Sequence, residues 1–373
     1  IKAMGYSDDA LSKPIIGITN TYSAYNACHG TVPQLIEAIK RGVMLAGGLP
    51  MEFPVISLHE SFSHPTSMFL RNLMSMDTEE LIRAQPMDAV VLVGGCDKTV
   101  PAQLMGAASA NIPAIQLVTG PMMTGRHRGE RLGACTDCRR FWAKYRAGEV
   151  DAEEIAAVEG RLATTAGTCA VMGTASTMAC IAETLGMSLP GTAAIPSVHA
   201  DRLVAAEETG KAAVQLIETP IRPSEVITEK SVENALRVLM AVSGSTNAIV
   251  HLAAIAGRRG IAIAPERLNQ ISDQTPVLVD LKPVGEGYME DFFAAGGVGA
   301  VLREIKHLLH LDTINVTGQR LGERLSPEME WIGRSVIRPF VDPVSPLGGL
   351  IALTGNLAPD GAIFKRAAAT PAL

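Results

Sequence analysis

The chain has 373 residues, of which 47% are hydrophobic and only 4% are aromatic. Its formal charge is −6, and no block of like charge occurs, which excludes the basic patch of a protein that binds nucleic acid or an anionic membrane surface. No apolar run approaches the roughly 20 residues of a membrane-spanning helix. The composition is typical of a cytoplasmic α/β enzyme, and the length allows one large domain with appendages or two to three average domains.

The first third of the chain alternates between strand and helix patterns. Short apolar runs predict strands at 14–18, 54–58, 89–93 and 114–118. The third run is continuously apolar, as in a strand that is buried on both faces. Residues 32–46 have helical spacing and end at Gly47-Gly48, and a short helix is expected to begin at Thr78. This alternation predicts an α/β fold with a parallel-rich sheet flanked by helices.

The middle of the chain is predicted to be helical, and the end is not. Helices are expected at 151–163 and 170–185, from Pro223 to about 242, and after Gly244 to about 256. Near Pro339 the sequence changes to Pro- and Gly-rich short strands at 350–353 and 362–364. We therefore expect an α/β domain over 1–338, followed over 339–373 by the start of a β-rich, barrel-like C-terminal domain that is truncated.

Polar clusters follow the first three predicted strands. They contain Cys28, then Glu60, and then the tripeptide Cys96-Asp97-Lys98. Because the carboxyl ends of parallel strands meet at one edge of a sheet, these side chains are expected to lie close together. A soft thiolate beside a hard carboxylate and a lysine favours two different metal centres around one substrate.

Two further cysteines receive different interpretations. Cys169 stands at the start of the helix predicted at 170–185, where the positive end of the helix would favour the thiolate that binds metal. Cys180 lies about three helical turns later, which would place it roughly 16 Å away, and it is interpreted as a core residue. His251, on an apolar helical stretch, is interpreted in the same way. Cys135 and Cys138 have a zinc-like spacing, but no matching second pair is nearby, which favours buried thiols.

Several motifs together resemble the dihydroxy-acid and sugar-acid dehydratase family, which includes phosphogluconate dehydratase. They are Asn26-Ala27-Cys28-His29, Gly94-Gly95-Cys96-Asp97-Lys98-Thr99, Gly167-Thr168-Cys169, Gly244-Ser245-Thr246-Asn247, Tyr288-Met289-Glu290-Asp291-Phe292 and Gly355-Asn356-Leu357-Ala358-Pro359-Asp360-Gly361. The resemblance covers essentially the whole chain. Residues 96–102 and 133–142 look closer to the pentonate and hexonate branch than to the branched-chain amino-acid branch, with L-arabinonate as the first substrate to test.

The resemblance implies two cofactors. Cys28, Cys96 and Cys169 would hold an iron–sulfur cluster with one iron open to substrate, a two-iron (2Fe-2S) form being favoured over a four-iron (4Fe-4S) form. Glu60, Asp97 and Lys98 would bind Mg²⁺, with the lysine carbamylated so that it offers anionic oxygens. The alternative for Lys98 is an ion pair with Asp97 or Glu60.

The implied reaction is the elimination of water from a 2,3-dihydroxy sugar acid, which gives a 2-keto-3-deoxy acid. In the family a serine of the C-terminal domain is the base, so this fragment alone is expected to lack the catalytic base. Ser245, Thr246 and Asn247 are candidates for substrate binding, with simple helix capping as the alternative.

The expected partner is a small-molecule sugar acid, with no nucleic acid and no membrane, and the family suggests a homodimer or a homotetramer. Three alternative functions remain. One is the dihydroxy-acid dehydratase of branched-chain amino-acid biosynthesis. The others are a non-catalytic module with structural zinc at Cys135 and Cys138, and an iron–sulfur electron-transfer protein.

Overall fold

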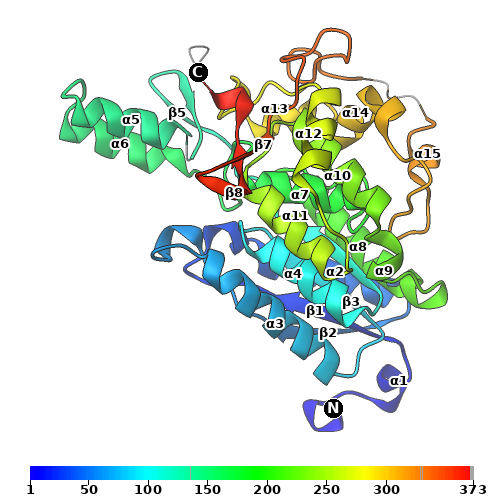
Figure 1. The fold of residues 1–373 in the computed structure, drawn as a ribbon. Coiled ribbons are helices and arrows are strands. Elements are labelled where there is room, and N and C mark those ends of the chain that lie inside the picture. The colour runs from blue at the N-terminus through cyan, green and yellow to red at the C-terminus, as the bar shows by residue number, and fades with distance from the viewer. Residues whose placement is uncertain (135, 328, 330, 370–373) are drawn as a thin grey trace.

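The computed structural model describes residues 1–134, 136–327, 329 and 331–369. A four-stranded, fully parallel sheet in the order β2-β1-β3-β4 lies in the N-terminal part (Figure 1). Its strands are β1 (Ile15–Asn20), β2 (Leu49–Pro54), β3 (Ala89–Gly94) and β4 (Ala114–Val118). β3 is buried along its whole length, as its continuous apolar sequence predicts. The predicted α/β class is confirmed.

The second predicted strand was wrong by several residues. β2 ends at Pro54 rather than beginning there, and Leu49 stands opposite Ile15 in the ladder. It is an edge strand, where a proline is tolerated because its nitrogen need not donate to a neighbour. Residues 55–59 consequently form a loop that leads from the carboxyl end of β2 to Glu60.

Helices cover the sheet. α2 (Val32–Leu45) and α8 (Ala200–Glu218) pack tightly against each other and against the strands. α4 (Thr99–Ala110) packs on β3 and β4, and α3 (Met68–Ala84) packs on α4. The short helix expected from Thr78 was therefore wrong: Thr78 is buried inside α3, where its hydroxyl donates to the carbonyl of Met74 at 2.9 Å instead of capping a helix start.

Further helices extend the same core away from the sheet (Figure 1). They are α7 (Thr174–Leu185), α10 (Glu229–Ala241), α11 (Asn247–Gly257), α12 (Pro265–Gln274), α13 (Met289–Ala294) and α14 (Gly297–Glu304). Shorter helices are α1 (Asp8–Leu11), α9 (Pro223–Val226) and α15 (Leu321–Arg324). The stretch predicted from Pro223 is split before α10, because Thr228 caps that helix by accepting from the backbone of Ser231.

α5 (Thr136–Arg146) and α6 (Ala152–Leu162) form a helical hairpin that projects from the body of the molecule (Figure 1). It has its own small core, in which Phe141 packs with Ile155 and Val158. Asp151 caps α6, in agreement with the predicted helix start. Two short strands, β5 (Gly125–His127) and β6 (Glu130–Leu132), lead into the hairpin and pair antiparallel.

The last described strands are the antiparallel β7 (Ile351–Gly355) and β8 (Ala358–Phe364), which are joined by a turn at residues 356–357. β7 packs on α12. The two short strands agree with the short strands predicted after Pro339. The domain boundary at 338/339 stays a prediction. None of the described helices combines the length and the apolar character needed to cross a membrane.

Candidate active site

Two of the predicted metal-binding cysteines are in contact. Cys28 lies in the turn Ala27–His29 beyond β1, and Cys96 follows β3 directly. Both are buried, and their side chains form a hydrogen bond with each other. This hydrogen bond, together with burial and the nearby Cys96, Cys169 and Asp97 charges, raises the pKa of Cys28 well above its usual value. The parallel sheet has therefore brought together two thiols that are far apart in the sequence.

His29 fixes the relative position of these two cysteines. Its Nε2 accepts hydrogen bonds from the backbone N–H groups of Gly95 at 3.0 Å and Cys96 at 3.2 Å. Its Nδ1 lies 2.8 Å from the carbonyl of Thr21, which requires the proton on Nδ1. Burial lowers the pKa of His29 to about 4, so the ring is neutral at pH 7 and can accept through Nε2. A residue adjacent to Cys28 thus anchors the backbone of Cys96.

Cys169 reaches the same place through backbone hydrogen bonds. The N–H of Gly167 donates to Ala27 at 2.9 Å, and the N–H of Thr168 donates to Gly120 at 2.9 Å. However, α7 begins at Thr174 and not at Ala170, so Cys169 is not at the helix N-terminus that the sequence predicted. The segment 167–173 is instead held in extended and turn conformations against residues 120–122. The dipole of α7 therefore does not explain why Cys169 would be a thiolate.

Glu60, Asp97 and Lys98 form a second polar cluster. Lys98 is buried, and its Nζ lies 3.0 Å from Glu60 Oε2 and 3.8 Å from Asp97 Oδ2. The hydroxyl of Ser67 also donates to Glu60. Burial raises the pKa of Asp97, which Lys98 opposes and Glu60 reinforces. The unmodified lysine thus makes the ion pair that was the alternative to a carbamate, and carbamylation stays a prediction.

The donor atoms sort into a sulfur group and an oxygen group. Within the described residues, no three His, Cys, Asp or Glu side chains are arranged around a single point so that they could hold one metal ion. A cluster does not require such convergence, because its own iron and sulfide atoms fill the space between the thiols. For Mg²⁺, the two carboxylates Glu60 and Asp97 are hard oxygen donors, and a carbamate on Lys98 would supply a third. The chemistry of these residues therefore suits both an iron–sulfur cluster and Mg²⁺.

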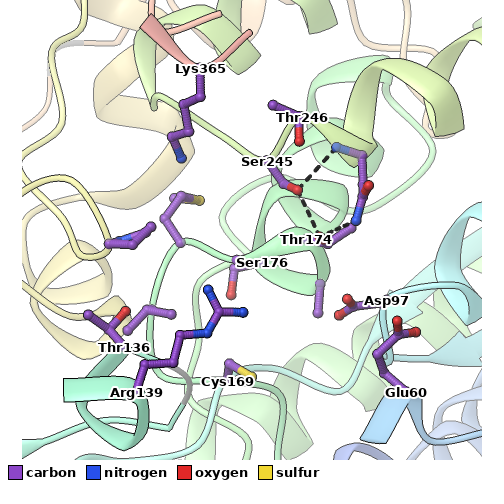
Figure 2. Close-up of a pocket in the computed structure, with 16 residues that line it drawn as sticks. Glu60, Asp97, Thr136, Arg139, Cys169, Thr174, Ser176, Ser245, Thr246 and Lys365 are labelled. Atoms are coloured by element: carbon purple, nitrogen blue, oxygen red, sulfur yellow. Dashed lines mark hydrogen bonds between the residues drawn. The ribbon is translucent and has the colours of Figure 1, made fainter. Parts of the chain in front are cut away.

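A cavity of about 620 Å³ adjoins both clusters (Figure 2). Its wall includes the following residues: Glu60, Asp97, Thr136, Arg139, Cys169, Thr174, Ser176, Ser245, Thr246, Asn247 and Lys365. The three predicted substrate residues line it. Ser245 Oγ lies 2.8 Å from Thr174 Oγ1 and accepts from the N–H of Asn247 at 3.2 Å. Ser245 therefore makes a local hydrogen bond at the start of α11 and also faces the cavity, whereas the N-cap residue Thr246 makes no side-chain capping hydrogen bond.

Sequence reasoning missed five polar residues of this cavity: Thr136, Arg139, Thr174, Ser176 and Lys365. Arg139 follows the Cys135–Cys138 motif, and Lys365 follows the last β-strand, so each stood beside a motif that had been noticed. Neither Arg139 nor Lys365 belongs to a helical period or to a ligand-like spacing that would have indicated a functional role. Only the folded chain brings α5 and the β7–β8 hairpin to the wall that α7 and α11 also form.

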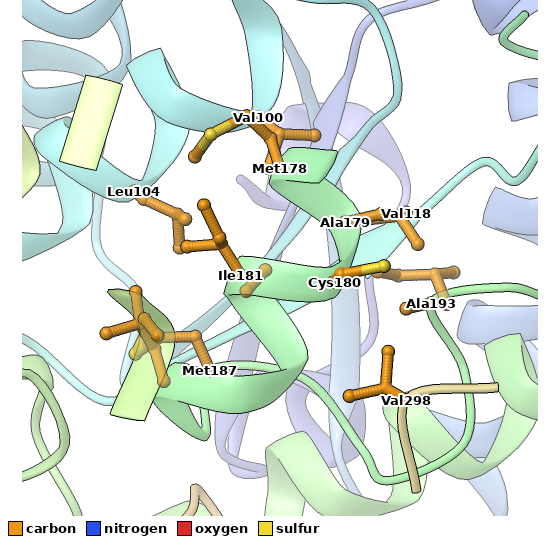
Figure 3. Packing of buried hydrophobic residues seen from close by; sticks show 14 of the residues in the cluster. Val100, Leu104, Val118, Met178, Ala179, Cys180, Ile181, Met187, Ala193 and Val298 are labelled. Atoms are coloured by element: carbon orange, nitrogen blue, oxygen red, sulfur yellow. The ribbon is translucent and has the colours of Figure 1, made fainter. Parts of the chain in front are cut away.

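The interpretations of Cys180 and His251 as core residues are confirmed. Figure 3 shows the fully buried Cys180 side chain among Val118, Ala193 and Val298, and burial raises its pKa. His251 is buried in α11, with Nδ1 3.0 Å from the guanidinium of Arg71. Burial lowers the pKa of His251 to about 3.

The zinc-like pair cannot be followed in full, because Cys135 lies outside the described residues. Its proposed partner Cys138 is half-buried in α5 and packs against the core of the α5–α6 hairpin. That packing agrees with the preferred interpretation of Cys138 as a buried thiol.

Comparisons with known proteins agree along the whole chain. A family model described as dihydroxy-acid/6-phosphogluconate dehydratase, N-terminal, matches residues 13–324, and its C-terminal counterpart matches residues 335–373. The chain is 44% identical to an L-arabinonate dehydratase of Rhizobium leguminosarum bv. trifolii, over 100% of this chain and 65% of the relative. It is 42% identical to a 6-deoxy-6-sulfo-D-gluconate dehydratase of Pseudomonas putida, over 98% of this chain and 64% of the relative.

A dihydroxy-acid dehydratase of Caldicellulosiruptor saccharolyticus is 41% identical, over 100% of this chain and 68% of the relative. The chain thus spans slightly less than two thirds of the L-arabinonate and sulfogluconate dehydratases. The names of these relatives cover several acids, so similarity alone does not select the substrate.

Proposed function

Because this chain belongs to the dihydroxy-acid/6-phosphogluconate dehydratase family, we propose that the protein eliminates water from a sugar acid and forms a 2-keto-3-deoxy acid. The resemblance that the motifs indicated is thereby confirmed at the level of the family. The observation that carries the proposal is that Cys169, Glu60 and Asp97 line one cavity, while the buried Cys28 and Cys96 interact with each other and Lys98 pairs with Glu60. The second candidate is a branched-chain dihydroxy acid as substrate, which the 41% identity to a dihydroxy-acid dehydratase supports.

In this proposal Cys28, Cys96 and Cys169 would hold an iron–sulfur cluster, with the two-iron form favoured. Glu60, Asp97 and a carbamylated Lys98 would hold Mg²⁺. When bound, the two centres would supply Lewis-acid polarisation of substrate oxygens. The buried position of Cys28 and Cys96 would keep solvent away from the sulfur ligands.

The remaining polar wall would orient the substrate. Thr174, Ser176 and Ser245 present hydroxyls at the cavity, and Asn247 presents an amide. Such groups both donate and accept, so they match the alternating hydroxyls of a sugar acid. A base must take the C2 proton while hydroxide leaves C3, and the resulting enol then tautomerises to the keto acid. We assign this base to no described residue, in keeping with the expectation of a serine from the C-terminal domain.

The decisive experiment measures keto-acid formation from a panel of aldonic acids, with L-arabinonate first, using full-length, anaerobically prepared protein. We expect Cys96→Ser and Lys98→Ala each to lower kcat by at least about 100-fold, because a lost metal ligand removes several kcal/mol of stabilisation. Cys180→Ala is the matched control, since Cys180 is a cysteine of the core and not of the cavity. An active Lys98→Ala variant would remove the Mg²⁺–carbamate assignment.

Metal analysis separates the alternative classes. Iron and acid-labile sulfide in the purified protein would support a cluster, whereas zinc alone would favour a structural module built on Cys135 and Cys138. Cluster-loaded protein that dehydrates no aldonic or branched-chain dihydroxy acid would favour electron transfer.

We also propose that the protein is a homodimer or a dimer of dimers. Light scattering of the cluster-loaded protein measures this directly. A monomer at micromolar concentration would contradict it.

A further inference from the structure

Ser176 is a hydroxyl residue of the cavity wall that is buried and has no partner. It is only 3% exposed, and within the described part of the chain its Oγ makes no hydrogen bond. The hydroxyls on either side of it along α7 are paired: Thr174 Oγ1 lies 2.8 Å from Ser245 Oγ, and Thr177 Oγ1 donates to the carbonyl of Gly173 at 2.7 Å. A buried hydroxyl without a partner is unfavourable, and an oxygen atom of a bound ligand would remove that cost.

Ser176 also stands where a helix offers backbone N–H groups. It is the third residue of α7, and the N–H groups of a first helical turn have no acceptor inside the helix. The N-cap residue, Gly173, supplies no side-chain cap, and a Cβ built there would meet no atom closer than the carbonyl oxygen of Val171 at 4.0 Å. The N–H of Ala175 already donates to the carboxylate of Asp97. Ser176 therefore presents an N–H beside its hydroxyl, and the space next to the N-cap is open.

The direction of the Ser176 side chain gives its hydroxyl access to a ligand. In Figure 2 the oxygen points away from Ser245, to the side of the cavity where Cys169 and Arg139 lie. Ser188 is the matched comparison, because it is also a buried serine whose Oγ has no partner among the described residues, but it lies outside the cavity wall. Of these two serines, only Ser176 can meet a molecule that enters the cavity.

We propose that Ser176 is a specificity-determining residue whose hydroxyl and N–H bind a further hydroxyl group of the substrate, beyond the two that react. The inference rests on the proposed function, in which the metal centres engage the carboxylate and the reacting hydroxyls. The oxygen left for Ser176 is then one that a sugar acid carries and that a branched-chain dihydroxy acid lacks. A substrate with an apolar group at this place would leave the buried hydroxyl unpaired, and that penalty would select against it.

The test compares one aldonic acid with its forms that lack a single hydroxyl beyond C3, using full-length, anaerobically prepared protein. We expect kcat/KM to fall about tenfold for one of these deoxy acids in the wild type, in keeping with the loss of one hydrogen bond to a buried partner. In Ser176→Ala the ratio between the parent acid and that deoxy acid should move toward one. Ser176→Thr, which keeps a hydroxyl, should restore part of the ratio, and Ser188→Ala should leave it unchanged.

The same variants test the choice between substrate classes. The preference for the sugar acid over a branched-chain dihydroxy acid, measured as the ratio of their kcat/KM values, should fall about tenfold in Ser176→Ala and stay unchanged in Ser188→Ala. A ratio between parent and deoxy acid that is the same in the wild type and in Ser176→Ala, for every deoxy acid, overturns the role of Ser176 and leaves the dehydratase proposal intact.

A different result would separate the two proposals from the other side. If no acid is turned over, the dehydratase proposal fails, and calorimetric titration with the parent and deoxy acids decides the role of Ser176. A difference in affinity of about tenfold that disappears in Ser176→Ala but not in Ser188→Ala supports that role, and equal affinities in the wild type overturn it.

Discussion

At the scale of single residues, the site depends on buried polar side chains whose partners lie on distant segments. His29 accepts two backbone N–H groups from the turn that carries Cys96, and Asp137 holds the start of α5. Both residues are buried, so water cannot replace a lost partner. Each therefore fixes the position of one element relative to another.

We expect His29→Leu to lower the free energy of unfolding by about 2–5 kcal/mol, because the buried N–H groups of Gly95 and Cys96 would both lose their acceptor. Urea unfolding of the metal-free protein measures this without relying on activity. His64→Leu, at an exposed histidine of a nearby loop, should change the midpoint little. Equal effects of the two substitutions would contradict the anchoring role of His29.

The second prediction at this scale concerns pH. Burial lowers the pKa of Lys365 to about 8, so its positive charge is present below that pH and is lost as the pH rises through it. Because Lys365 lines the cavity, affinity for a sugar acid, whose carboxylate stays ionised throughout, should therefore fall about tenfold between pH 7 and pH 9.5.

The comparison for this measurement is Lys365→Arg, because a guanidinium stays protonated throughout that range. Its profile should be flatter than that of the wild type. Identical profiles would show that Lys365 does not contact the bound anion.

At the scale of elements, the sheet is held by a close approach of α2 and α8. A Cβ at Gly42 would lie 2.0 Å from the carbonyl oxygen of Glu207, and one at Gly210 would lie 2.3 Å from that of Ile39. The two helices therefore meet at reciprocal glycines, with almost no space between their backbones. This packing supports β1 and β3, the strands from which Cys28 and Cys96 emerge.

We expect Gly42→Ala to destabilise the protein by about 1–3 kcal/mol, since the new methyl group must push α8 away from α2. The matched substitution is Gly160→Ala in α6, where nothing lies within 4 Å of the new Cβ. It should instead stabilise by roughly 0.5–1 kcal/mol through helix propensity. Thermal unfolding of the two variants provides the measurement, and a stabilising Gly42→Ala would refute the close contact.

At the scale of the whole molecule, the candidate site joins segments that are otherwise separate. The three cysteines come from a turn after β1, from the end of β3 and from the segment before α7. Arg139 and Lys365 add the helical hairpin and the last strands. A group bound by all three thiols would cross-link the N-terminal sheet to the helical part of the core.

We therefore expect cluster loading to raise the free energy of unfolding by about 3 kcal/mol or more, because a group that binds only the folded state stabilises it. Calorimetry of metal-free and reconstituted protein measures the difference. Cys169→Ser should lose most of this gain, and Cys180→Ala should retain it. A gain that persists in Cys169→Ser would exclude Cys169 as a ligand.

Part of this architecture could be predicted from sequence because its signals are local. β3 is a continuous apolar run, α2 has an apolar stripe that ends at Gly47-Gly48, and Asp151 caps α6. β2 and the start of α3 escaped prediction, because edge-strand pairing and the burial of Thr78 depend on neighbours far along the chain. α8 was missed altogether, since its contact face is made of small residues and not of a strong apolar stripe.

The amino-acid sequence by itself determined the α/β class and the family, because these follow from local patterns and from motifs in a fixed order, and its metal ligands stay a prediction. Tertiary structure alone decided that Cys28 touches Cys96, that Lys98 pairs with Glu60, and that Arg139 and Lys365 share one cavity. The reason is physical: such contacts depend on where the packing of the core places the ends of separate elements, and no short stretch of sequence encodes that position.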